Sequence, residues 1–120
     1  MSEDVFSVTV RVVADGVVLA VRGDLDAHTT PELLERIGDL SLHSGQLFVV
    51  DLSGLLFCDS SGISAFIAAR NHALSARADI VLVAVPRQVL RVLGMIGLEA
   101  LFTVRPSVEH AFSDRRAGGG

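Results

Sequence analysis

Asp59, Ser60, Ser61 and Gly62 form a polar cluster inside a segment that is otherwise apolar. An Asp or Ser side chain at the start of a helix accepts hydrogen bonds from free backbone N–H groups, so the cluster is first of all a candidate helix cap. One oxygen is enough for a cap, however, and a glycine in the first turn costs the helix about 1 kcal/mol relative to alanine. The surplus of hydroxyls and the glycine indicate a second role, and a glycine here suggests the close approach of another backbone segment.

A nucleophilic serine is one chemistry that the cluster could support. The chain has no G-x-S-x-G motif, and a triad of Ser60, His28 and Asp26 would depend only on two loops being near each other. We therefore expect the chain not to be an enzyme.

Phosphorylation of Ser60 fits the sequence better. A phosphate adds about −1.5 to −2 charges, which a helix N-terminus tolerates because its dipole and its free N–H groups favour anions. The carboxylates of Asp59, and of Asp24 and Asp26 from an earlier loop, would make the same surface strongly negative. A partner that buried this surface would meet like-charge repulsion, so the modification should switch off binding and leave folding intact.

The elements that position the cluster begin with an expected hairpin. Residues 5–14 and 17–22 are rich in valine and are separated by Asp15 and Gly16, which suit a two-residue turn. A helix should then start at Thr29 or Thr30, before Pro31, and continue to the Ser–Gly pair at 44–45.

The rest of the chain alternates between strand and helix patterns. The expected order is β-β-α-β-α-β-α-β-α, which is an α/β fold with a mixed sheet: an N-terminal antiparallel hairpin followed by parallel strands. Sites in such sheets lie where loops leave the carboxyl ends of strands, as the 23–30 loop and the 59–62 turn both do. The later elements are expected as a strand from Leu47, a helix to Arg70, a strand at 79–85, a helix from Pro86, a strand at 101–104 and a helix at 107–114.

Composition limits the classes of function. The 120 residues suit one domain, expected at 1–114, with a disordered C-terminal tail at 115–120. No apolar run reaches the roughly 18 residues of a membrane span, and the first residues are acidic, so we expect a cytoplasmic protein without membrane association. The net charge of −4 and the scattered arginines argue against nucleic-acid binding, which leaves a protein as the expected partner.

Cofactor chemistry has little support in this composition. The chain has no lysine for a phosphate-binding loop, and its four histidines and single cysteine show no metal-ligand spacing. We expect no cofactor and no metal, and we expect Cys58 to be buried and unreactive.

Three stretches resemble the STAS-domain anti-sigma factor antagonists. They are the Gly-Asp-Leu-Asp sequence at 23–26, the Val-Asp-Leu sequence at 50–52 and the Phe-Cys-Asp-Ser-Ser-Gly sequence at 57–62 before a helix of small residues. The resemblance covers about residues 5–112 in element order. It implies the STAS fold, with helices mainly on one side of the sheet.

The resemblance also implies a partner-switching role in transcription regulation. By similarity, Ser60 is the residue phosphorylated by a GHKL-type serine kinase that is also the anti-sigma factor. The unphosphorylated antagonist would bind that kinase and release the sigma factor, and a PP2C-type phosphatase would restore the active form. The implied partner surface comprises Asp24, Asp26, Asp59, Ser60, Ser61 and Gly62, on a monomer or weak dimer.

A different STAS system is the alternative. The module could belong to a lipid transporter or to a stressosome-like scaffold. The serine in the Asp-Ser-Ser-Gly turn favours the antagonist, since some transporter modules have threonine or no hydroxyl there. Stressosome proteins usually have an extra N-terminal domain, for which 120 residues leave no room.

Overall fold

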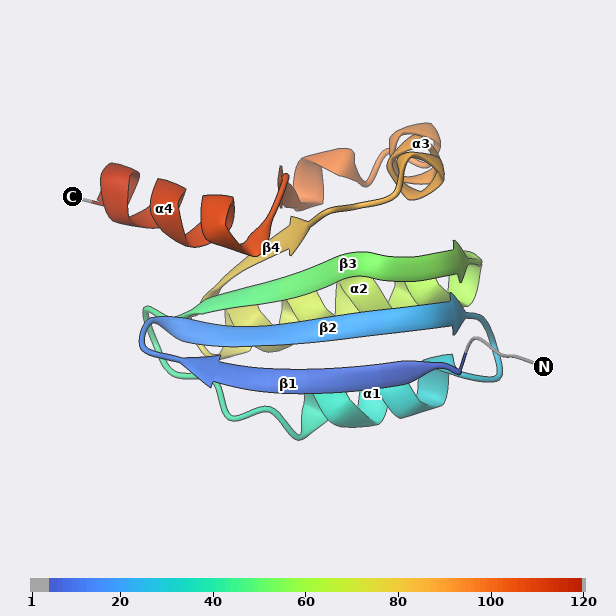
Figure 1. Ribbon diagram of the computed structural model, residues 1–120, viewed down its shortest axis with the longest axis horizontal. Helices are drawn as coiled ribbons and strands as arrows, with labels where there is room; N and C mark the ends of the chain where they lie inside the picture. Colours follow the sequence, from blue (N-terminus) through green and yellow to red (C-terminus); the bar gives the residue numbers. More distant parts are fainter. Residues whose placement is uncertain (1–4, 120) are drawn as a thin grey trace.

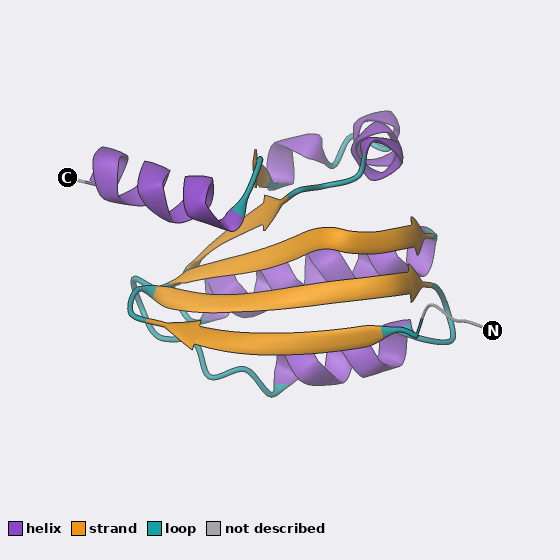
Figure 2. Ribbon diagram, viewed as in Figure 1, coloured by secondary structure: helices purple, strands orange, loops and turns teal. Residues whose placement is uncertain are grey.

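The computed structural model describes the backbone of residues 5–119 and the side chains of residues 5–115. Five strands form one sheet, with helices on both of its faces (Figures 1 and 2). The elements are β1 (Ser7–Val13), β2 (Gly16–Leu25), α1 (Thr30–Gly38), β3 (Leu47–Cys58), α2 (Ser60–Ser75), β4 (Asp79–Val83), α3 (Arg87–Met95), the 3-10 helix η1 (Glu99–Leu101), β5 (Thr103–Arg105) and α4 (Val108–Gly119).

The sheet has the strand order β1-β2-β3-β4-β5. β1 pairs with β2 antiparallel, and every later pair is parallel. The expected α/β fold, the mixed sheet and the order β-β-α-β-α-β-α-β-α are therefore confirmed.

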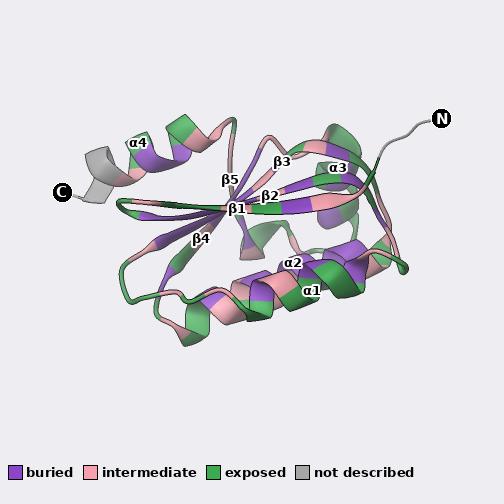
Figure 3. Ribbon diagram, turned by 60° about the horizontal axis from the view of Figure 1, so that its bottom comes forward, coloured by how far each residue is buried: buried purple, intermediate pink, exposed green. Residues whose placement is uncertain are grey.

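Most of the helical packing lies on one face of the sheet. The main core joins buried residues of α1, α2 and α3 to the sheet, with Phe48 and Phe66 as its largest fully buried side chains. On the opposite face, Ala111 and Phe112 of α4 cover a smaller core formed by valines and a leucine of β2, β3 and β4. Figure 3 shows α1 and α2 side by side below the sheet and α4 above it. The apolar run in β3 is explained by this arrangement, because both faces of that strand are covered.

The N-terminal elements differ in their bounds from the expected ones. The hairpin turn consists of Ala14 and Asp15, while Gly16 already pairs in β2. A Cβ atom on Gly16 would lie 1.9 Å from the carbonyl oxygen of Leu47, so this glycine permits the close approach of β3. The first helix ends at Gly38 and not near residue 44. Leu40 and Leu42, which continue its apolar pattern, pack against the main core from the loop that follows.

The C-terminal helix is longer than expected. We expected residues 115–120 to form a disordered tail, but α4 continues to Gly119; residue 120 lies outside the described residues. The guanidinium of Arg115 is 3.3 Å from the Asp79 carboxylate and also donates to the carbonyl of Gly45. These contacts attach residue 115 to the domain, whereas the boundary at 114 stays a prediction. Within the described residues, no helix is long and apolar enough to cross a bilayer.

Candidate functional site

Asp59 caps the helix that follows it, as the sequence predicts. Its backbone is extended, with φ −102° and ψ −170°, and α2 starts at the next residue. The backbone N–H of Ser61 donates to Asp59 Oδ1 at 2.9 Å, and the Ser61 hydroxyl donates to the same oxygen at 2.5 Å. The cap therefore uses the carboxylate of Asp59 and the hydroxyl of Ser61.

The hydrogen bonds to this carboxylate change its titration. The Ser61 hydroxyl contributes most, and the backbone N–H groups of Ser61, Gly62 and Ala27 add to it; together they outweigh partial desolvation and lower the pKa of Asp59. Hydrogen bonds to the charged form stabilise that form, so the cap depends on an ionised Asp59.

The lowered pKa predicts a pH-dependent contribution to stability. In the unfolded chain the pKa of Asp59 is about 3.9, and in the folded state it is lower, so the folded protein keeps this charge to a lower pH. The stabilisation of the fold by the Asp59 charge should be complete above the unfolded-state pKa. It should be lost as the pH falls through the folded-state pKa. Denaturant unfolding of wild type and Asp59→Asn should thus show a larger stability difference at pH 7 than at about pH 2. An equal difference at both pH values would contradict the prediction.

Ser60 differs from Ser61 in what its hydroxyl does. The Ser61 hydroxyl is occupied by Asp59 and lies 3.5 Å from the Thr30 hydroxyl. Ser60 is exposed at the first position of α2, and no described residue hydrogen-bonds to its hydroxyl, although its carbonyl accepts from the Ser64 hydroxyl at 3.3 Å. Of the two serines, Ser60 is therefore the one whose oxygen is available for a reaction.

The Asp26 loop lies against the cap. The backbone N–H of Asp59 donates to the Leu25 carbonyl at 3.2 Å, and the backbone N–H of Ala27 reaches the Asp59 carboxylate. Because β2 and β3 are parallel neighbours, their carboxyl ends bring the 23–30 loop and the 59–62 turn together. The juxtaposition expected from the sequence is present.

Asp26 itself shapes this loop. Its Oδ1 accepts hydrogen bonds from the backbone N–H groups of His28 and Thr29, at 2.9 and 3.0 Å. The Thr29 hydroxyl bridges back to the Asp24 carbonyl at 2.8 Å. Asp24 is exposed and Asp26 is half-buried, so the two carboxylates have different surroundings. A contact of either residue with a partner stays a prediction.

Gly62 is surrounded by side chains. We expected another backbone segment to approach this glycine, but a Cβ atom on it would lie 2.5 Å from Cys58 Sγ and 2.7 Å from Leu25 Cδ2. Leu25 is completely buried and cannot swing away. The glycine thus allows the first turn of α2 to pack on the ends of β2 and β3.

We expect Gly62→Ala to destabilise the fold by about 1–2 kcal/mol, because overpacking outweighs the better helix propensity of alanine. Gly38, in the last turn of α1, is the matched control, since nothing lies within 4 Å of a Cβ atom there. Denaturant titration should show Gly38→Ala to be neutral or stabilising. Equal effects of the two changes would contradict the packing argument.

Cys58 is half-buried beside the cap. Burial, and then the negative charge of Asp59, raise the pKa of its thiol to about 11. A thiol that stays protonated at neutral pH is a poor nucleophile and a poor metal ligand. In the part of the chain that the structure describes, no three His, Cys, Asp or Glu side chains are grouped as metal ligands.

An apolar groove lies next to Ser60, and the sequence analysis missed it. We call it the Ser60 groove; it has a volume of about 340 Å³ and is lined by Cys58, Asp59, Ser60, Ile63, Ser64, Ile67, Val92, Ile96 and Leu98. Ile96 is 53% exposed, and Val92 is 38% exposed. The available signal was the sequence of α3, where apolar residues continue beyond the buried face formed by Val89 and Leu93.

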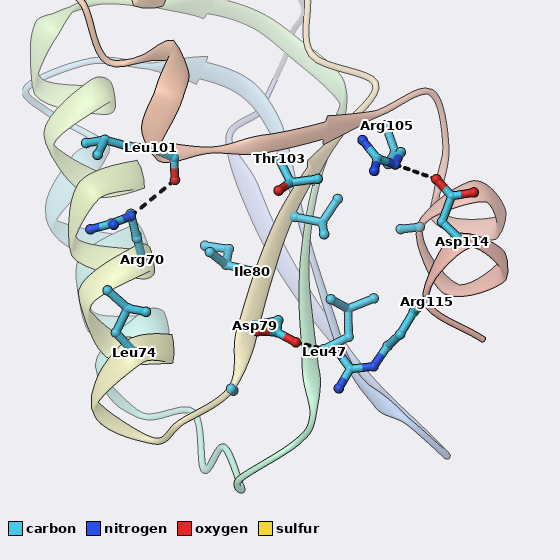
Figure 4. A pocket seen from close by; sticks show the side chains of 13 residues that line it. Leu47, Arg70, Leu74, Asp79, Ile80, Leu101, Thr103, Arg105, Asp114 and Arg115 are labelled. Carbon is cyan, nitrogen blue, oxygen red and sulfur yellow. Dashed lines mark hydrogen bonds and ion pairs between the residues drawn. The ribbon is translucent and has the colours of Figure 1, made fainter. Parts of the chain in front are cut away.

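A second cavity has a volume of about 390 Å³, and Figure 4 shows the residues that line it. It includes the first residues of β3 and β4, at the opposite ends of those strands from the cap, and is closed by α2 and α4. Its three arginines have partners: Arg70 donates to the Leu101 carbonyl, Arg105 pairs with Asp114, and Arg115 pairs with Asp79. Since these cations are already engaged, the cavity is a poor site for an anion.

The fold and the cap define a small mixed-sheet domain with an exposed serine at the start of its central helix. The STAS domain family model matches residues 7–111, and the chain belongs to that family. The resemblance found in the sequence is confirmed.

Individual proteins are similar to this chain in sequence or in structure. The anti-sigma-B factor antagonist of Listeria monocytogenes is 23% identical over 91 residues, which are 76% of this chain and 80% of the relative. The crystal structure of an anti-sigma factor antagonist from Mycobacterium paratuberculosis is 26% identical, with a TM-score of 0.82 over 96% of this chain and 97% of that one. The phosphorylated form of the Bacillus cell fate determinant SpoIIAA is 18% identical, with a TM-score of 0.66 over 89% and 97%; at that identity the likeness shows the fold alone.

Proposed function

We propose that this chain is an anti-sigma factor antagonist controlled by phosphorylation of Ser60. In the unmodified state it binds an anti-sigma factor that is also a GHKL-type serine kinase, and this binding releases a sigma factor. A PP2C-type phosphatase reverses the modification. The chain acts by binding in the cytoplasm and not as an enzyme.

The observation that carries this proposal is the unequal use of the two hydroxyls in the turn. The Ser61 hydroxyl donates a hydrogen bond to the Asp59 carboxylate, whereas Ser60 is exposed at the N-terminus of α2. A kinase can therefore reach Ser60 without opening the helix. The names of the relatives from Listeria and Mycobacterium support the antagonist role.

The Ser60 groove supports a partner surface at the same place. Exposed apolar side chains on Val92 and Ile96 stand beside the polar cap, an arrangement typical of the apolar centre and polar rim of an interface. Asp24, Asp26, Asp59, Ser61 and Gly62 complete the proposed surface around Ser60.

A phosphate on Ser60 would act at the rim of this groove. Ser60 and Asp59 both line it, so a phosphate of about −2 charge would stand next to a carboxylate where the partner must remove water. Desolvating two neighbouring anions is costly, whereas the positive end of the α2 dipole tolerates the charge in the unbound chain. Binding is therefore lost while the fold is kept.

Phosphorylation by the cognate kinase of the same organism tests the proposal. We expect mass spectrometry to place one phosphate on Ser60 in the wild-type chain and in Ser61→Ala, and none in Ser60→Ala. Phosphate on another residue, or none on the wild type, would contradict it. Co-purification with an ABC ATPase in place of the kinase would favour a lipid-transporter module.

A further inference from the structure

The outer edge of β1 carries an inference that is independent of Ser60. Among the described strands, β1 is the first in the sheet order and pairs with β2 alone. In Figure 1 it forms one margin of the sheet, with α1 next to it. Thr9 and Val12 are exposed, and Val12 has 74% of its surface accessible.

The register shows which backbone groups of β1 face outward. The two-residue turn closes on the pair of Val13 and Gly16, which is a hydrogen-bonded pair in such hairpins. Because hydrogen-bonded and non-hydrogen-bonded pairs alternate, Val8, Val10 and Val12 direct their N–H and C=O groups away from β2. Within the described residues, the edge therefore directs the backbone groups of three residues away from β2.

Arg36 occupies one of these outward groups. From α1, its Nη1 donates to the carbonyl oxygen of Val8 at 2.8 Å. The Arg36 side chain is half-buried and the Val8 side chain is buried, so the contact is part of the packed structure. An added strand would need the same oxygen as an acceptor, so the guanidinium competes with the N–H of that strand.

The edge is self-complementary apart from this contact. Under a two-fold axis at Val10, each Val10 faces the Val10 of a second copy, and each Val8 faces a Val12. All of these would be hydrogen-bonded pairs, and pairing would cover the exposed Val12 side chains. The described strand has no proline and no bulge, and its one charged residue is Arg11, which would face Thr9 of the second copy in this arrangement; prolines, charges and bulges are the usual protections of an edge.

We propose that the outer edge of β1 is a pairing surface for a second copy of this chain, and that Arg36 keeps it closed. Each two-fold dimer would need two Val8 carbonyls, and an Arg36 side chain holds each of them. Replacing Arg36 removes the guanidinium from both copies, so one substitution frees the Val8 carbonyl oxygens on both sides of the dimer. The two chains would then share one continuous sheet through antiparallel β1 strands.

The test is the association constant of the full chain, measured by sedimentation equilibrium. Arg36→Ala removes the side chain, and Arg36→Met keeps its aliphatic stem in case the shorter variant folds poorly. Both should associate at least about tenfold more tightly than wild type. Arg91→Ala removes an equal charge from exposed α3 and should behave like wild type.

A second substitution shows whether β1 is the surface involved. Val12→Lys places a charge on an exposed residue of the edge and, combined with Arg36→Met, should return association to the wild-type level. The proposal is overturned if neither Arg36 variant associates more tightly than wild type, or if Arg91→Ala gives the same gain. It is also overturned if Val12→Lys leaves the gain intact.

Discussion

Ser60→Asp should lower the affinity of the chain for its cognate anti-sigma factor by at least about tenfold and leave the fold intact. Tenfold is about 1.4 kcal/mol, a modest demand for a charge introduced at the rim of an apolar interface. The carboxylate would stand beside Asp59, and both would have to be desolvated when a partner covers the Ser60 groove. A full phosphate should have a larger effect, because it carries about twice the charge.

The fold should survive because Ser60 is exposed at the first position of α2. A negative charge there interacts favourably with the helix dipole, and the Asp59 cap does not use the Ser60 hydroxyl. Titration calorimetry measures the affinity, and circular dichroism with denaturant measures the stability.

Ser113→Asp is the matched control for this experiment. Ser113 is exposed on α4, which covers the opposite face of the sheet from the main core, so the variant has the same net charge far from the site. It should bind like wild type. Equal losses for both variants would mean that net charge and not position decides binding, and an unfolded Ser60→Asp would refute the separation of binding from folding.

The features that sequence reasoning predicted depend on local rules. The Asp59 cap follows from residue preferences at one helix start, and the hairpin follows from two valine-rich runs around a short turn. The meeting of the Asp26 loop with the cap follows from a topological rule, since neighbouring parallel strands end at the same edge of a sheet.

The features that sequence reasoning missed depend on tertiary packing. Leu40 and Leu42 extend the apolar pattern of α1 and so appeared helical, although they reach the core from a loop after Gly38. A glycine can admit backbone or side chains equally well, so only the structure identifies the neighbours of Gly62 as Leu25 and Cys58. Similarly, no local pattern places Ile96 beside Ser60, because the distance between them depends on how α3 packs against α2.

Ile96→Ala should weaken binding of the anti-sigma factor by about tenfold, and this prediction tests the groove directly. Truncating an apolar side chain at the centre of an interface costs about 1–2 kcal/mol or more, whereas truncation at the margin costs little. Ile96 lines the Ser60 groove and is 53% exposed, so alanine removes contact surface without opening a hole in the core. Adding Val92→Ala, on the same groove, should weaken binding further.

Met95 provides the control next to Ile96 in the chain. It is 76% exposed and does not line the groove, so Met95→Ala removes an apolar side chain of similar size from outside the proposed contact. If the groove is the contact, calorimetry should give Met95→Ala a dissociation constant within about threefold of wild type, well below the effect of Ile96→Ala. If both variants bind as tightly as wild type while Ser60 is still phosphorylated, the groove is not part of the contact with the partner.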